Sequence, residues 1–248
     1  MKSHPLESLT AEEINKAVDL YRSHDKSDEK TLFINITLVE LSKEIVRSYK
    51  EGEEFDRSVK IVGVDSKPDG GFVASIDLNK EEVTFIERLP NEAQAAYSFA
   101  EVGLATVLTK QNKEYQDALK KRDVTNLDLV QIDPWPAGGV VHESIKPGHR
   151  AMRTISFLKE NETDNAYAKP IQGVISHVDL TLKEVTCVED FGVVPVPKAH
   201  ARYDAESQSE FREQPKPIEI TQPEGAGFEV EGNQISWEGW QLRASIHP

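Results

Sequence analysis

The sequence predicts an α+β protein built from two similar domains, each a helical layer on an antiparallel sheet, followed by an extended linker and a terminal strand. Three observations support this fold class. A strand–turn–strand pattern occurs twice at a fixed offset, a helical pattern precedes the strand patterns in each half, and a proline-rich stretch ends in alternating apolar residues. The expected boundaries are 1–90 for the first domain, 91–198 for the second, and 199–248 for the linker and strand.

The internal repeat is the basis for expecting two similar domains. Residues 74–87, ASIDLNKEEVTFIE, return as residues 176–189, SHVDLTLKEVTCVE, and Asp77 and Asp179 lie 102 residues apart. Each copy has the pattern of a strand, a short turn and a second strand. The repeat therefore predicts a hairpin near the end of each of two domains of about a hundred residues.

The first domain is expected to hold one helix on a sheet of four or five strands. Thr10 and Glu13 have capping-box spacing, and Ile14, Ala17 and Tyr21 continue with helical spacing. Alternating apolar residues then predict strands at 32–38, 59–65 and 72–78, with a turn at 68–71 between the last two.

The second domain repeats this order. The segment Pro90-Asn91-Glu92 has the composition of a helix start, and a helical pattern continues through about Lys121. Strand patterns follow at 127–132, 151–158, 173–180 and 184–191.

The remaining residues predict a linker and a last strand. Five prolines between 195 and 223 exclude a continuous helix, so this stretch is expected to lie extended over a surface. From Ile235 to Pro248, Trp240, Leu242, Ala244 and Ile246 alternate with polar residues, as in a strand with one buried face. Such a strand needs partners, which suggests that the chain is the front part of a larger protein.

Composition limits the possible partners. A formal net charge of −14 disfavours binding to nucleic acid or to an anionic membrane. No apolar run reaches the roughly 20 residues of a membrane-spanning helix, and no basic-then-apolar leader opens the chain, so we expect a cytoplasmic protein. Cys187, the single cysteine, excludes an internal disulfide and is interpreted as a core residue.

Histidine offers the only hint of chemistry in the residues themselves. His142 and His149, with Glu143 nearby, suggest a metal cluster, but a seven-residue gap that contains Pro147 and Gly148 suits neither a helix nor a strand site. Exposed loop histidines are the preferred interpretation. His177 falls within a strand pattern and is expected to be a packed or edge residue.

Several short motifs, taken in order, resemble one protein family. They are HPL and LTAEEI within residues 4–14, NAYAKPI at 165–171, Pro195 and Pro197, TQPEG at 221–225, and WEGW at 237–240 with Arg243. The combination resembles the amino-terminal, noncatalytic region of the copper- and topaquinone-containing primary amine oxidases. This resemblance implies two cystatin-like α+β domains and the first strand of a catalytic β-sandwich, which would be the partner domain of this region. The complete enzyme would be a homodimer.

The implied reaction oxidises a primary amine to an aldehyde, with ammonia and hydrogen peroxide as the other products. The family uses copper, held by a His-x-His pair and a third histidine, and a quinone made from the tyrosine of an Asn-Tyr-Asp/Glu motif. Neither motif occurs in this sequence. We therefore assign no catalytic, cofactor-binding or metal residue on this basis, and expect the chain alone not to oxidise amines.

The resemblance also gives candidate substrate-channel residues. The segments DPWPAG at 133–138 and YAKP at 167–170 match parts of the family's second small domain that line the mouth of the amine channel. Pro134, Trp135 and Tyr167 are the candidates, and packing at loop–sheet junctions is the other interpretation. A stand-alone cystatin-like binding module, which would recognise peptides through strand edges, remains the alternative function. A small independent enzyme or metal protein has the least support.

Overall fold

The computed structural model describes residues 4–25, 27–66, 70–90, 93–198, 202 and 204–245. The chain divides into two compact units, one made of Met1–Asp65, Gly71–Arg88 and Glu213–Pro248, the other of Ser66–Gly70 and Leu89–Arg212. The domain boundaries expected from the sequence stay predictions.

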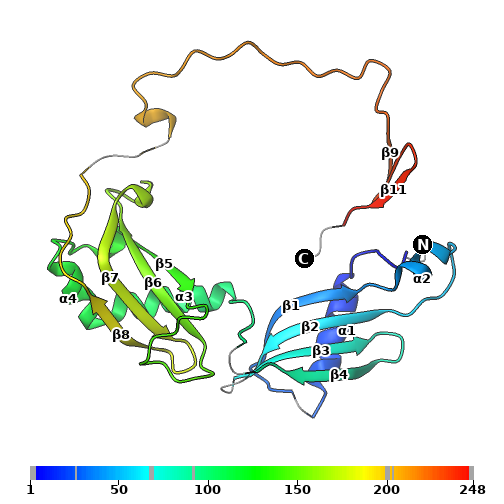
Figure 1. Ribbon diagram of the computed structural model, residues 1–248, viewed down its shortest axis with the longest axis horizontal. Helices are drawn as coiled ribbons and strands as arrows, with labels where there is room; N and C mark the ends of the chain where they lie inside the picture. The colour runs from blue at the N-terminus through cyan, green and yellow to red at the C-terminus, as the bar shows by residue number, and fades with distance from the viewer. Residues whose placement is uncertain are drawn as a thin grey trace. The chain divides into compact units, whose positions relative to one another are not determined.

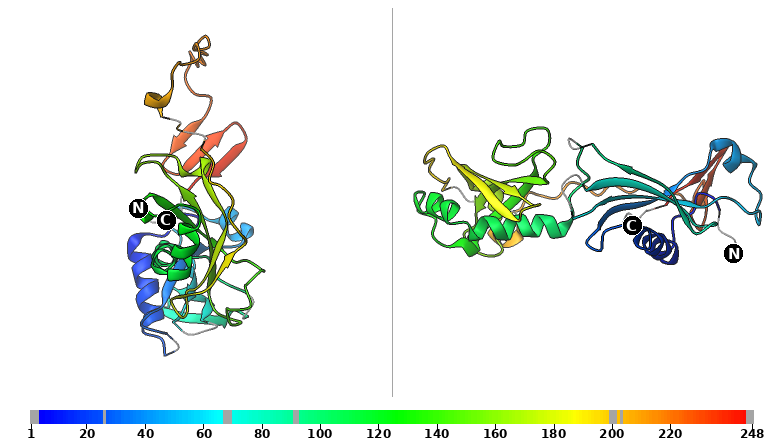
Figure 2. Two further views of the ribbon diagram at one scale, coloured as in Figure 1. Left: turned by 90° about the vertical axis from the view of Figure 1, so that its left-hand side faces the viewer. Right: turned by 90° about the horizontal axis from the view of Figure 1, so that it is seen from below.

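The first unit is a four-stranded antiparallel sheet with one long helix against it (Figures 1 and 2). Its strands run in the order β1-β2-β3-β4. The elements are α1 (Ala11–Arg22), β1 (Leu32–Val39), the short α2 (Lys43–Ser48), β2 (Ser58–Val64), β3 (Gly71–Asp77) and β4 (Glu82–Arg88). This confirms the predicted helix and strands. The predicted turn at 68–71 includes residues 67–69, which lie outside the described part of the chain.

The core of the first unit lies between α1 and the sheet. The capping box of Thr10 and Glu13 starts α1 as predicted, and this helix buries Ala17 and Tyr21. The Tyr21 ring stacks on Phe72 of β3 with centroids 4.6 Å apart. The apolar stripe of α1 thus packs against the apolar face of the sheet, where alternate strand residues point toward the helix.

The second unit has the same plan, a helical layer on one face of a four-stranded antiparallel sheet of order β5-β6-β7-β8. Its elements are α3 (Phe99–Gln111), α4 (Lys113–Lys120), β5 (Val130–Pro136), β6 (Ala151–Leu158), β7 (Pro170–Asp179) and β8 (Glu184–Asp190). Three single-turn helices, η1 (Leu127–Leu129), η2 (Ala166–Ala168) and η3 (Ala205–Ser207), lie between or after them.

The predicted helix start at Pro90-Asn91-Glu92 is wrong. Asn91 and Glu92 lie outside the described residues, but residues 93–98 are not helical and α3 begins at Phe99. Ser98 and Glu101 form a capping box there, so the helix starts where its free backbone N–H groups find acceptors. A second cap at Asn112 separates α3 from α4 and interrupts the single helix that we expected.

The repeated hairpins, β3–β4 and β7–β8, share details that the sequence does not reveal. The strand register shifts between Ser75 and Ile76 in the first and between His177 and Val178 in the second. Each shift skips one threonine, Thr84 or Thr186, so both hairpins carry a β-bulge at the same point.

The expected single terminal strand is instead part of a small three-stranded sheet. The strands β9 (Glu229–Glu231), β10 (Gln234–Trp237) and β11 (Trp240–Arg243) pair in the order β11-β10-β9. A turn at Glu238-Gly239 divides the predicted strand, because Glu238 adopts a φ of 49°. Ile246 lies outside the described residues.

The segment before this sheet is extended, as predicted, but is not buried against a surface. Ile218 and Ile220 are 89% and 91% exposed. Among the described residues, no helix is long and apolar enough to cross a membrane.

Candidate functional site

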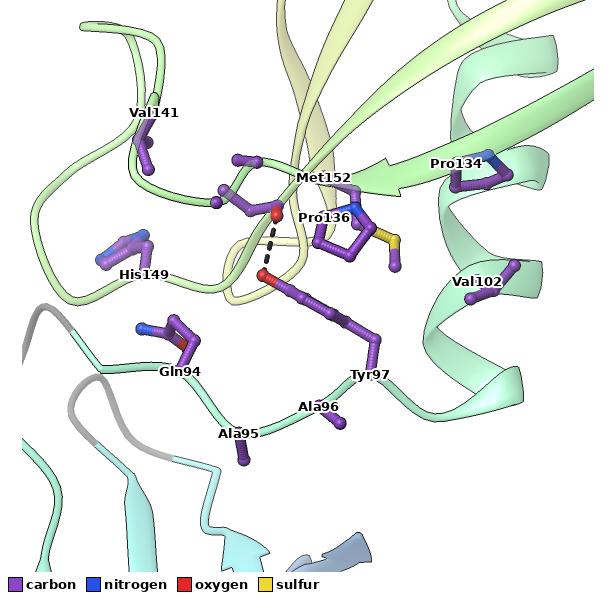
Figure 3. Close-up of a pocket in the computed structure, with 13 residues that line it drawn as sticks. Gln94, Ala95, Ala96, Tyr97, Val102, Pro134, Pro136, Val141, His149 and Met152 are labelled. Atoms are coloured by element: carbon purple, nitrogen blue, oxygen red, sulfur yellow. Dashed lines mark hydrogen bonds between the residues drawn. The ribbon is translucent and has the colours of Figure 1, made fainter.

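A pocket of about 470 Å³ lies in the second unit, between the segment that precedes α3 and the ends of β5 and β6. Figure 3 shows Tyr97, Val102, Pro136 and Met152 around it, with His149 at one side. The Tyr97 hydroxyl donates a hydrogen bond of 2.8 Å to the Ala151 carbonyl oxygen. Burial raises the pKa of Tyr97, so this hydroxyl stays protonated and remains a donor.

A buried salt bridge positions the segment that forms one wall of the pocket. Arg150, the residue before β6, donates from Nε to Glu101 Oε1 at 2.5 Å and from Nη2 to Glu101 Oε2 at 3.0 Å. Its guanidinium also donates to the carbonyl oxygens of Ala95 and Ala96 and lies 4.3 Å from the Tyr97 ring centroid. One arginine therefore holds the helix start, the wall and the tyrosine together.

The carboxyl group of Glu101 is the anionic partner in this arrangement. Desolvation by burial is the largest effect on its pKa and raises it, but the hydrogen bonds from Arg150 and Ser98 outweigh burial and lower the pKa. The salt bridge thus stays charged at neutral pH.

His149 is also held by a buried carboxylate. Its Nδ1 lies 2.7 Å from Asp179 Oδ2, and Asp179 Oδ1 accepts a hydrogen bond from the Leu182 backbone N–H. The residues that line the pocket include no serine, threonine or cysteine, and the polar side chains that it offers to a ligand are those of Gln94, Tyr97 and His149.

Two of the three candidate channel residues are exposed aromatics. Trp135 of β5 is 54% exposed, and Tyr167 of η2 is 61% exposed. Tyr167 packs edge-on against Phe157 with ring centroids 5.0 Å apart. A hydrogen bond to the Asp133 carboxylate, which lies two residues before Trp135, raises the pKa of Tyr167. Asp133 and Trp135 share one face of β5 because side chains alternate along a strand.

The third candidate, Pro134, lies on the other face of β5. It lines the Tyr97 pocket together with Pro136, as Figure 3 shows. The structure therefore separates the three residues that the resemblance grouped. Trp135 and Tyr167 belong to the face away from the helices, and Pro134 belongs to the pocket.

The interpretation of His142 and His149 as exposed loop histidines is wrong, because both are partly buried and the His149 side chain is only 8% exposed. His149 pairs with Asp179, whereas His142 stacks on His177 with ring centroids 4.4 Å apart. His177 Nε2 lies 2.7 Å from Glu189 Oε2. The expectation of a packed strand histidine is confirmed for His177, which is 9% exposed. His200 and His247 lie outside the described residues.

The family's copper and quinone sites do not fit these residues. Within the described ranges, no three histidines come close enough to share one ion. The full sequence contains no His-x-His pair, and neither Tyr167 nor Tyr203 follows an asparagine.

Comparison with known proteins identifies the family. Residues 100–208 match the family model for the copper amine oxidase N3 domain. The chain is 34% identical over 246 residues to the primary amine oxidase of Arthrobacter sp. (strain P1), an alignment that covers 99% of this chain and 37% of that protein. This chain belongs to the copper amine oxidase family. It corresponds to the amino-terminal region of these enzymes, as the sequence motifs predicted.

Two further similar proteins agree with this assignment. The histamine oxidase of Arthrobacter globiformis is 32% identical over 246 residues, which cover 98% of this chain and 35% of that protein. A copper-containing benzylamine oxidase from Hansenula polymorpha has the same fold, with a TM-score of 0.77 at 18% identity over 97% of this chain and 40% of that one. The chain thus spans about two-fifths or less of the length of these similar proteins. The predicted α+β fold is confirmed.

Proposed function

We propose that this chain is the noncatalytic amino-terminal region of a primary amine oxidase, and that its second unit forms part of the mouth of the substrate channel. The observation that carries the channel proposal is the exposed group of Trp135 and Tyr167 beside Asp133. Aromatic faces attract cations, and a carboxylate attracts them by charge. Together they suit a protonated primary amine on its way to a reaction centre elsewhere.

The chemistry itself belongs to the rest of the enzyme in this proposal. A catalytic β-sandwich would supply copper and topaquinone and convert the amine to an aldehyde, ammonia and hydrogen peroxide. The residues of this chain would bind and guide the amine. The similar proteins bear names that specify a primary amine oxidase and a histamine oxidase, which supports an amine as the substrate class.

The small sheet at the end of the chain supports the proposed packing on that catalytic domain. Val230, Trp237, Trp240 and Leu242 are between 46% and 62% exposed. Apolar side chains gathered on such a small sheet favour burial against a partner surface. We propose that this partner is the catalytic β-sandwich of the same enzyme, which would act as a homodimer.

Steady-state kinetics of the complete enzyme test the channel proposal. Trp135→Ala and Tyr167→Ala should change KM among small aliphatic and aryl-alkyl amines at nearly constant kcat, because the lost contacts lie away from the reacting atoms. Phe99→Ala is the matched control, since this aromatic side chain is 98% exposed and lies on α3. Unchanged constants for every amine, with only a lower Tm, would assign Trp135 and Tyr167 to packing.

A further inference from the structure

The loop between β5 and β6 brings His142 onto the outer face of the sheet, the face away from α3 and α4. There its ring stacks on His177 of β7 at 4.4 Å, with 30° between the ring planes. Glu189 of β8 contacts the same His177 ring through a 2.7 Å hydrogen bond. One ligand atom from each of the three side chains lies within 4.8 Å of the other two.

A chain of hydrogen bonds fixes the loop in this position. His142 Nδ1 lies 2.8 Å from Ser144 Oγ and accepts a hydrogen bond of 3.1 Å from the Ser144 backbone N–H. Ser144 Oγ lies 2.8 Å from Thr186 Oγ1, which donates to the His177 carbonyl oxygen at 3.3 Å. Thr186 is the bulge residue of β8, so in this unit the bulge also supplies the hydroxyl that links Ser144 to His177.

We propose that His142, His177 and Glu189 form a binding site for a divalent cation of the zinc class. Two imidazoles and one carboxylate are the donor set of open zinc sites, in which a water molecule takes the fourth position. Harder cations such as Mg²⁺ prefer sites made of oxygen alone. The proposal goes beyond the proposed function because it concerns an ion held by this chain's own residues.

The hydrogen bonds indicate which atoms would bind. Ser144 engages Nδ1 of His142, which leaves Nε2 as the ligand atom. The ring proton would then move to Nδ1 and be donated to Ser144 Oγ, while the hydrogen bond from the Ser144 backbone N–H to Nδ1 would be lost. A hydrogen-bonded partner for the second ring nitrogen is usual in metal-binding histidines. At His177, the ion would replace the proton between Nε2 and Glu189.

The required movement is small. Tetrahedral bonds of about 2.0–2.2 Å would separate the ligand atoms by about 3.4 Å. In the structure, one donor atom of each of the three side chains lies within 4.8 Å of the other two. The paired strands β7 and β8 already hold His177 and Glu189 side by side. Side-chain rotation can therefore bring the three ligand atoms to the shorter separation. The Glu189 side chain is 30% exposed, which gives an ion and its water a path from solvent.

Calorimetric titration of the chelator-treated 248-residue chain with Zn²⁺ tests the site. We expect saturable one-to-one binding, with an increase in Tm on addition of Zn²⁺. His142→Gln and Glu189→Gln should each weaken binding about ten-fold or more, because each removes a ligand. Mg²⁺ should produce neither signal.

Two control variants make the outcome decisive. His24→Gln makes the same change on the first unit, next to Asp25, and should leave the affinity unchanged. Cys187→Ser tests whether zinc binds instead to the thiol of Cys187, the residue that pairs with His177 across the strands. Loss of binding in Cys187→Ser but not in His142→Gln would overturn the proposal, as would an absence of binding in the unmodified chain. Circular dichroism of each variant separates ligand loss from unfolding, and His142 lies in a loop where glutamine disturbs no strand.

Discussion

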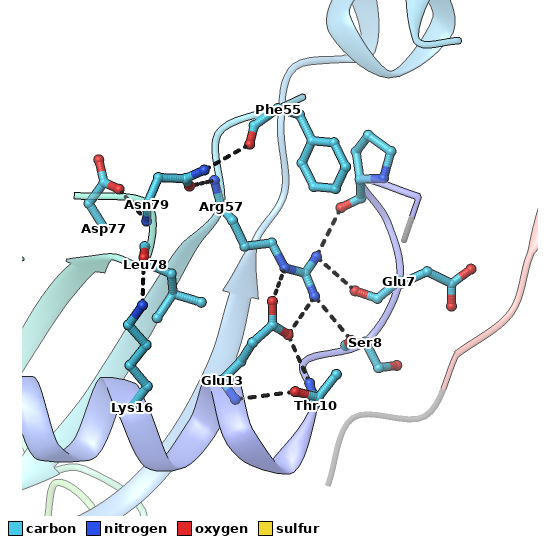
Figure 4. A network of polar contacts seen from close by, with 11 residues as sticks. Glu7, Ser8, Thr10, Glu13, Lys16, Phe55, Arg57, Asp77, Leu78 and Asn79 are labelled. Carbon is cyan, nitrogen blue, oxygen red and sulfur yellow. Dashed lines mark hydrogen bonds and ion pairs between the residues drawn. The ribbon is translucent and has the colours of Figure 1, made fainter. Parts of the chain in front are cut away.

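Arg57 and Arg150 perform the same structural task in the two units. Each lies directly before a strand and binds both carboxylate oxygens of the glutamate that completes a capping box, Glu13 for Arg57 and Glu101 for Arg150. Figure 4 shows the guanidinium of Arg57 also donating to the backbone carbonyls of Glu7 and Ser8, which precede α1. Each unit therefore fastens its entry segment to its sheet through one arginine.

Removing either arginine should be strongly destabilising. Arg150→Ala would leave the Glu101 carboxylate and the Ala95 carbonyl oxygen buried without their donor, which predicts a loss of about 3–5 kcal/mol. Arg57→Ala should act in the same direction. Arg202→Ala is the control, because Arg202 and Asp204 form a solvent-exposed pair whose loss should change the stability little. Urea unfolding measures all three, and equal effects would contradict the prediction.

The same pairs predict a loss of stability in acid. Arginine and backbone hydrogen bonds hold the folded pKa of Glu13 and Glu101 below the ordinary value of 4.5, against burial, which is the largest effect and raises it. Their stabilising effect is therefore fully present above the unfolded pKa of about 4.5 and is lost as the pH falls through the lower folded pKa.

Unfolding free energies between pH 7 and pH 3 check this dependence. Glu101→Gln should lower stability at pH 7 and flatten the decline below about pH 4.5, because the titrating group is gone. A variant with the same acid slope as the unmodified chain would show that Glu101 does not contribute to it.

Two buried tyrosines should respond in opposite directions to loss of the hydroxyl. Tyr115 Oη and Ser156 Oγ share a buried hydrogen bond of 2.6 Å, so Tyr115→Phe should cost about 1–3 kcal/mol. The Tyr21 hydroxyl is buried without a hydrogen-bond partner among the described residues. Tyr21→Phe should therefore be neutral or stabilising by up to about 1 kcal/mol. Thermal unfolding of the two variants decides, and a matching loss in both would reveal a partner for Tyr21.

Gly63 should tolerate no side chain. A Cβ atom there would lie 2.4 Å from Cζ of Phe72, its cross-strand neighbour, and 3.1 Å from the Leu32 carbonyl oxygen. Phe72 is fully buried and cannot move aside, so Gly63→Ala should destabilise by about 1–3 kcal/mol. Gly139→Ala is the control, because a Cβ there meets open space. Equal stability of the two variants would mean that the β2–β3 pair can shift.

The chain by itself should not oxidise amines. Copper needs about three or four placed donors, and the quinone needs both copper and its precursor tyrosine. Purified chain incubated with copper and oxygen should yield no peroxide from a panel of primary amines and no quinone stain. A copper-dependent quinone signal would contradict this.

Most strand positions were predictable because the strands carry a local alternation, although the strand expected at 127–132 begins only at Val130, after the single turn η1. β6 spans the predicted residues, and β1, β2 and β3 match their predictions within a residue or so at each end. The start of α3 was missed although its capping box, Ser98 and Glu101, is visible in the sequence, because Pro90 offered an earlier helix start.

The side-chain clusters had no comparable local signal. His142 and His177 lie 35 residues apart and meet only because a loop folds back over the sheet. The equivalence of Arg57 and Arg150 was hidden for a related reason. These arginines are 93 residues apart, whereas the repeated hairpins are offset by 102, so different loop lengths remove the common period.

The bulges at Thr84 and Thr186 change the phase of each hairpin's second strand. Counted with an unbroken period of two, Val185 and Glu189 would point to the same side. The extra residue lets Val185 pack into the core while Glu189 reaches His177 on the outer face. The short strand β8 thus places a side chain in the core near its start and another on the outer face near its end. Val83 and Glu87 stand in the same phase relation in the first unit, where Ser75 replaces the histidine and the exterior position has no imidazole to meet.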